Sequence, residues 1–166
     1  MIDFTYLEGK DGELVVKELA TVDSHNNRVS SYLFKRPYSW EDMSLINVRL
    51  NEAIDHGCNW NDVYVPYSDL ENVVHCEATS AVVICFGPLK TEFISSLINL
   101  TVIDITQLGC PPIADINLST ISGTFACHNK SKHVYALRTA YSVAQWLHFY
   151  TISLQYVSCP AQPECH

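Results

Sequence analysis

The chain has 166 residues, 48% of them hydrophobic, which suffices for one filled core and is too few for two ordinary domains. Its net charge of −8 excludes a protein that holds a polyanion by bulk electrostatics, because that mode needs an excess of lysine and arginine. No apolar run approaches the roughly 20 residues of a membrane span, and no basic-then-apolar leader opens the sequence. We therefore expect an intracellular protein, cytoplasmic or nuclear, that is not secreted and not bound to a membrane.

The seven cysteines predict free thiols, with room for a metal site, more than a disulfide framework. Their number is odd, and several lie in apolar stretches. Without an export signal, such cysteines are typical of a reducing compartment.

The first 36 residues predict an antiparallel β-meander. Two β-rich runs, 1–8 and 13–23, are separated by a turn that contains Asp11-Gly12. A second turn leads into a third run over 28–35, which ends before Pro37. Ser39 then provides an N-cap for a helix of about four turns that continues to Gly57.

The middle of the chain predicts a second helix and a βαβ unit. Ser68 and Glu71 have the spacing of a capping box, which places a short helix through Val74. The continuous apolar run 80–86 is typical of a strand buried on both faces. A helix over 89–98 and a short buried strand over 101–105 then complete a parallel pair with a right-handed crossover.

The last third predicts one irregular segment and one helix. Residues 106–134 are rich in turn-forming residues and show no clear period. From Tyr135 the apolar positions follow helical spacing to about His148. We therefore expect one domain over 1–150 and a loosely ordered C-terminal tail over 151–166.

This order of elements, over about residues 1–150, resembles the RNase H-like superfamily and, in its details, the DEDD (DnaQ-like) exonuclease branch. The resemblance implies an α/β fold with a mixed sheet, in which a three-strand antiparallel meander is followed by alternating helices and parallel strands. It also implies a nuclease site, where carboxylates hold two Mg²⁺ or Mn²⁺ ions that activate water and stabilise the leaving oxygen.

The residues at the family's catalytic positions are mostly of the wrong type. The four acids and the histidine of the family fall, in chain order, on Asp3, Thr5, Lys90 or Thr91, Val134 and Thr139. Only the first of them is a carboxylate. The resemblance therefore implies a catalytically inactive, exonuclease-like domain.

The degenerate domain of the Maelstrom family is similar, because it combines a DEDD-exonuclease-like fold with lost acids and a zinc quartet. Uncharacterised arthropod proteins, including sequences of mobile-element type, also look similar. This resemblance implies a module that binds protein or RNA.

Four carboxylates stay candidates for catalysis if the domain is active. It would then be a divalent-metal-dependent 3′–5′ exonuclease, or another nuclease, with the acid set Asp3, Glu92, Asp104 and Asp115. Asp104 and Asp115 equally suit turn or cap positions, and Asp3 could be an ordinary strand residue.

A structural zinc site is a second candidate. Thiolates and imidazoles are zinc ligands, and four of them lie in or beside the irregular segment: Cys110, Cys127, His128 and His133. Adjacent residues seldom both ligate one ion. The simpler alternative is a buried thiol at Cys110 and solvent-facing histidines.

Contact residues for a partner are a third candidate. Trp60 lies in a predicted loop, where an aromatic ring could contact a partner. Lys130, Lys132 and Arg138 are the main basic residues near the expected cleft and could contact a phosphate, although such residues more often solvate a loop.

Overall fold

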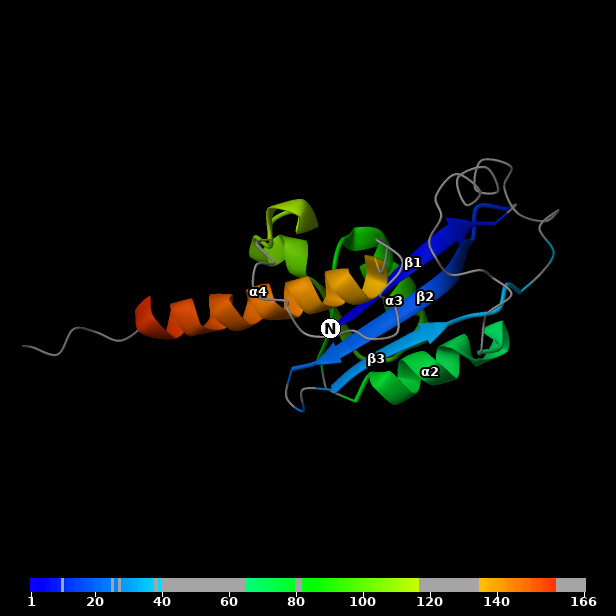
Figure 1. The fold of residues 1–166 in the computed structure, drawn as a ribbon, viewed down its shortest axis with the longest axis horizontal. Helices are drawn as coiled ribbons and strands as arrows, with labels where there is room; N and C mark the ends of the chain where they lie inside the picture. The colour runs from blue at the N-terminus through cyan, green and yellow to red at the C-terminus, as the bar shows by residue number, and fades with distance from the viewer. Residues whose placement is uncertain are drawn as a thin grey trace, which may run out of the picture.

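Three antiparallel strands form the first part of the fold (Figure 1). The computed structural model describes residues 1–9, 11–24, 26, 28–37, 39, 65–79, 82–116 and 135–157, with side chains over 136–151 in the last range. Strands β1 (Ile2–Glu8), β2 (Leu14–Asp23) and β3 (Arg28–Leu33) pair in the order β1-β2-β3. The predicted meander is confirmed, and Gly12 takes a positive φ of 81° in its first turn.

Helix α2 (Leu70–Glu77) follows a single 3-10 turn, η2 (Tyr67–Asp69). The helix was predicted, but its capping box does not form. Asp69 is the N-cap and makes no side-chain cap bond, and the Ser68 hydroxyl lies 3.4 Å from the Asp69 carboxylate instead. The 3-10 turn moves the helix start past Ser68. The helix predicted over 39–57 lies outside the described residues.

The βαβ unit consists of β4 (Val82–Cys85), α3 (Pro88–Leu97) and β5 (Thr101–Asp104), and its two strands are parallel, as predicted. The prediction that the first of these strands is buried on both faces is wrong. Val83 and Cys85 are buried, but Val82 is 43% exposed. One face of β4 therefore packs into the core and the other is partly open.

Helix α4 (Tyr135–Val157) is longer than predicted. The expected end near His148 is wrong, and residues 151–157, which the sequence assigns to the tail, are helical. No glycine or proline follows Tyr135 until Pro160, so the sequence provides no residue that stops the helix earlier. Before α4, the irregular segment contains two short 3-10 turns, η3 (Ile105–Leu108) and η4 (Ile113–Asp115).

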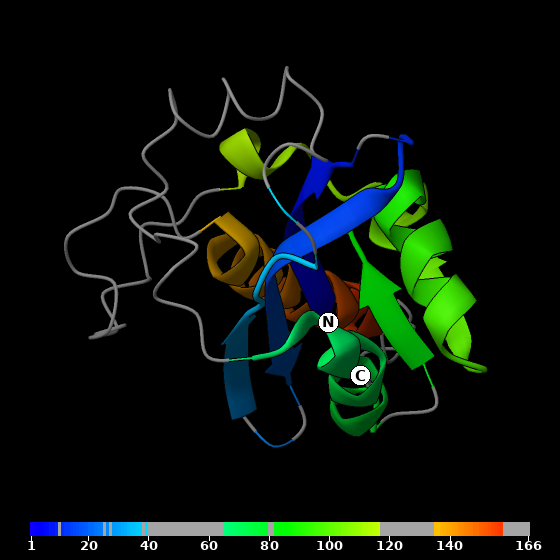
Figure 2. The same ribbon diagram turned by 90° about the vertical axis from the view of Figure 1, so that its right-hand side faces the viewer.

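The helices cover both faces of the strands, which gives a mixed α/β architecture (Figure 2). On one face, α2 and α3 bury Val74 and Ile94 against Phe4 and Leu19. The opposite face packs on α4 through a separate cluster, which comprises Ala20, Val22, Ala136, Leu137 and Ala140. Strand β1 contacts β4, so the parallel pair lies next to the meander. Among the described residues the two form separate hydrogen-bonded sheets and not the single mixed sheet that was predicted.

Gly87 joins β4 to α3 with φ 93° and ψ 152°, a conformation essentially restricted to glycine. We expect Gly87→Ala to lower the unfolding free energy by about 2 kcal/mol in urea denaturation. Gly109→Ala is the matched control and should lower the unfolding free energy by only about 1 kcal/mol. The φ of 83° and ψ of 18° of Gly109 lie in the left-handed helical region, which alanine can adopt at that cost. Equal losses for the two variants would contradict this account.

Candidate functional site

A buried ion pair links the first strand to α3. Asp3 on β1 is 1% exposed, and the ammonium of Lys90 lies 2.7 Å from its Oδ1. Lys90 is in the first turn of α3, and its Nζ also lies 5.4 Å from the centre of the Phe4 ring. Burial raises the pKa of Asp3 to about 6, although the charge of Lys90 and the hydrogen bond that it donates oppose this rise.

Asp104 ends β5 and ties it to the turn between β4 and α3. Its Oδ1 accepts a hydrogen bond from the Gly87 N–H at 2.9 Å and another from the Thr106 N–H at 3.0 Å. Asp104 is the N-cap of η3 and is 4% exposed. It therefore occupies a cap position, one of the roles expected from the sequence.

The negative charges of Asp3 and Asp104 both affect the thiol of Cys85. Its side chain is fully buried, and the pKa of the thiol is raised to about 12, mainly by desolvation and then by the negative charge of Asp3. A thiol in this setting stays protonated at neutral pH. Cys85 is thus a packing residue rather than a nucleophile.

Glu18 on β2 is a further buried carboxylate, which the sequence reading missed. It is 8% exposed and accepts hydrogen bonds from the backbone N–H groups of Ala136 and Leu137, at the start of α4. The Ser31 hydroxyl lies 3.4 Å from its Oε1. Burial raises the pKa of Glu18 despite these bonds. The sequence feature that could have indicated this buried acid is its place within the apolar run of β2.

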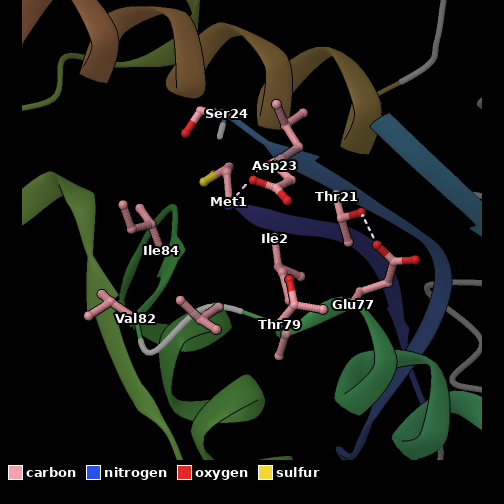
Figure 3. Close-up of a pocket in the computed structure, with 12 residues that line it drawn as sticks. Met1, Ile2, Thr21, Asp23, Ser24, Glu77, Thr79, Val82 and Ile84 are labelled. Atoms are coloured by element: carbon pink, nitrogen blue, oxygen red, sulfur yellow. Dashed lines mark hydrogen bonds between the residues drawn. The ribbon is translucent and has the colours of Figure 1, made fainter. Parts of the chain in front are cut away.

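Glu77, at the end of α2, was also missed and forms part of a small pocket (Figure 3). Its side chain is 5% exposed and accepts hydrogen bonds from the Thr21 hydroxyl at 2.8 Å and from Arg28 and Tyr32. The pocket has a volume of about 110 Å³ and lies between the ends of β1 and β2, α2 and β4. The lining includes none of the residues that the sequence predicts for a site.

The acid set proposed for an active nuclease is not brought together. Asp3 and Asp104 are buried, whereas Glu92 on α3 and Asp115 in η4 are exposed. Across the part of the chain that the structure describes, no group of three histidine, cysteine or acidic side chains could hold a metal ion.

Several predicted residues cannot be placed in the site. Arg138 is exposed on α4. The remaining candidates for partner contacts and for zinc lie outside the described residues: Trp60, Cys127, His128, Lys130, Lys132 and His133.

Cys110 is the one predicted zinc ligand within the described residues. It is 7% exposed and packs in an apolar cluster with Ile105 and Val143. Desolvation raises the pKa of its thiol to about 11. The contacts described for Cys110 are apolar, and the zinc site stays a prediction because its other ligands lie outside the described residues.

Within the residues described, no helix has the length and apolarity needed to cross a membrane. No protein-family model, no curated protein and no solved structure matches the chain.

Proposed function

We propose that the chain is a catalytically inactive, exonuclease-like domain of RNase H-like layout that acts as a binding module. The observation that carries the proposal is the Lys90–Asp3 ion pair at 2.7 Å. In an active domain of this layout a divalent ion would lie beside Asp3 and be held by a second acid after the fourth strand. Here that second position is a lysine, and its ammonium neutralises Asp3.

An ammonium group cannot replace the metal chemically. A divalent ion acts as a Lewis acid and keeps coordination positions for water and substrate oxygen, which lowers the pKa of the bound water. Lys90 supplies one positive charge and no coordination position. Oδ1 of Asp104 is likewise already bonded to two backbone N–H groups. Groups of the protein itself therefore bind both buried acids at the positions where a metal site would need free carboxylate oxygens.

The arrangement of the elements supports the RNase H-like part of the proposal. An antiparallel meander lies next to a parallel strand pair, and β1 contacts β4, the two strands that would be neighbours in that layout. Helix α4 covers the face opposite α2 and α3. These features favour a retained scaffold whose catalytic positions have changed.

A protein is the favoured partner, and RNA is the alternative. The net charge of −8 opposes an RNA backbone, and binding would depend on local cations such as Arg138. We expect single-stranded RNA to bind no more tightly than about 10⁻⁴ M at physiological salt, as measured by fluorescence anisotropy. Micromolar binding that weakens steeply with salt would instead identify RNA as the partner.

A nuclease assay tests the loss of activity. With Mg²⁺ or Mn²⁺ and single-stranded RNA or DNA, we expect cleavage at the rate of the enzyme-free control. Metal-dependent cleavage that Asp3→Asn abolishes, and that the matched change Asp11→Asn at an exposed turn residue leaves intact, would contradict the proposal.

A second variant tests the exchange of metal for lysine without relying on activity. Lys90→Asp places a second carboxylate beside Asp3, where a divalent ion can bind both. We expect millimolar Mn²⁺ to raise the melting temperature of Lys90→Asp and to leave that of the wild type unchanged. If Mn²⁺ stabilises the wild type equally, Lys90 does not occupy the place of a metal.

A further inference from the structure

The distal half of α4 leaves the body of the protein. Among the side chains described for this helix, which end at Thr151, Val143 is the last that is fully buried, and Leu147 is the last that packs against a core cluster. Beyond it, His148 and Thr151 are exposed and Phe149 is 60% exposed. Figure 1 shows the orange-to-red end of the helix extending past the strands.

This part of the helix has no charge and many aromatic rings. No aspartate, glutamate, lysine or arginine occurs from Thr139 to Val157, although the chain as a whole has a net charge of −8. The rings of Trp146 and Tyr150 stack with their centres 4.8 Å apart. A surface of this composition suits contact with apolar protein surface.

The helix also needs a contact to be stable there. Its residues from 148 to 157 are mostly aromatic, β-branched or hydroxylic, which are moderate helix formers, and they contain no charge pairs. A short helical segment of this kind is marginal in water unless one face packs against another element. Packing along the exposed side of α4 would stabilise it.

We propose that this contact is a second copy of the chain, with the two distal halves of α4 packed side by side about a two-fold axis. The proposal is independent of the function proposed above, because it rests on α4 and not on Asp3. A two-fold interface joins the same surface of both copies, so an uncharged helix meets an uncharged helix. Antiparallel helices would also hold the two acidic bodies at opposite ends of the pair.

Charge favours a second copy over other occupants. Nucleic acid would require lysine or arginine along the helix. A helix that lies in a lipid surface typically carries basic residues on its polar face, and Thr139 to Val157 provides none. An overlap of about 15 Å, or ten residues at 1.5 Å each, makes an interface at the small end of the range, so the dimer should be weak.

Sedimentation equilibrium of the full chain, from about 1 to 200 μM, tests the proposal. We expect the mass to rise from 18.7 kDa toward twice that value and the amides of 148–157 to gain protection from hydrogen exchange over the same range. Phe149→Glu should raise the dissociation constant at least tenfold, because the two new charges meet in the interface. Leu89→Glu, a matched change at an exposed leucine of α3, should leave association unaltered.

Three results would overturn the proposal. A mass of 18.7 kDa at every concentration excludes the dimer. Equal association of Phe149→Glu and wild type places the interface elsewhere. If the protein does not self-associate but binds vesicles of phosphatidylcholine, with or without anionic phosphatidylserine, the surface is a lipid-binding one.

Discussion

Replacing Lys90 by methionine should lower the unfolding free energy by about 3 kcal/mol at pH 8 and by much less at pH 4.5. Methionine keeps most of the apolar stem of the side chain but removes the ammonium 2.7 Å from Asp3. The carboxylate of Asp3, 1% exposed, is then buried without a counter-charge, which is strongly destabilising. Urea denaturation at the two pH values measures both losses.

The pH dependence follows from the pKa of Asp3. In the folded protein this pKa is about 6, above the ordinary value of 3.8, so folding favours the protonated acid. The resulting stabilisation is full below pH 4 and is lost as the pH rises through about 6. Without Lys90 the pKa of Asp3 rises further, and each further unit costs about 1.4 kcal/mol at pH 8.

Two further variants make this result specific to the pair. Asp3→Asn combined with Lys90→Met removes both charges, so it should recover most of the lost stability and remove the part of the pH dependence that Asp3 contributes. Lys35→Met, at an exposed lysine, should have little effect at either pH. A loss for Lys90→Met that is the same at pH 4.5 and pH 8 would show that packing, rather than charge, explains it.

Asp104→Ala should lower the unfolding free energy by about 3 kcal/mol, whereas Asp104→Asn should lower it by about 1 kcal/mol. Alanine leaves the N–H groups of Gly87 and Thr106 without their acceptor in a buried place. Both groups donate to the same oxygen, Oδ1, and asparagine also has an oxygen at that position. Chemical denaturation at pH 7 measures the two losses.

The exposed acid Asp115 provides the control, because Asp115→Ala should change the unfolding free energy by no more than about 0.5 kcal/mol. If Asp104→Asn is as destabilising as Asp104→Ala, the negative charge of Asp104, and not its oxygen acceptor, holds this turn.

The elements that the sequence predicts well are those whose signals are local. The Asp11-Gly12 turn and the alternating runs beside it define the meander, and Gly87-Pro88 separates a strand from a helix. The prediction of a capping box at Ser68 was wrong because the same residues also suit a 3-10 turn. Tertiary packing decides between the two structures. The predicted end of α4 was wrong because the periodicity of apolar residues weakens where a helix leaves the core.

The candidate site was predicted only in part, because its contacts join residues distant in the chain. Asp3 was found by resemblance, and Lys90 was identified as a replacement for an acid, but their ion pair depends on how α3 lies over β1. Glu18 and Glu77 have no neighbouring motif that indicates a bonding partner. Each is bonded by groups from a distant element, at the start of α4 and on β2 and β3.

The bonds between Glu18 and the start of α4 have a consequence for the order of folding. The first N–H groups of a helix need an acceptor, and here the acceptor comes from a strand near the other end of the chain. The first turn of α4 therefore acquires its cap only after the meander has formed and a long loop has closed. Contacts between residues that are far apart in the chain form slowly, so we expect α4 to dock late in refolding.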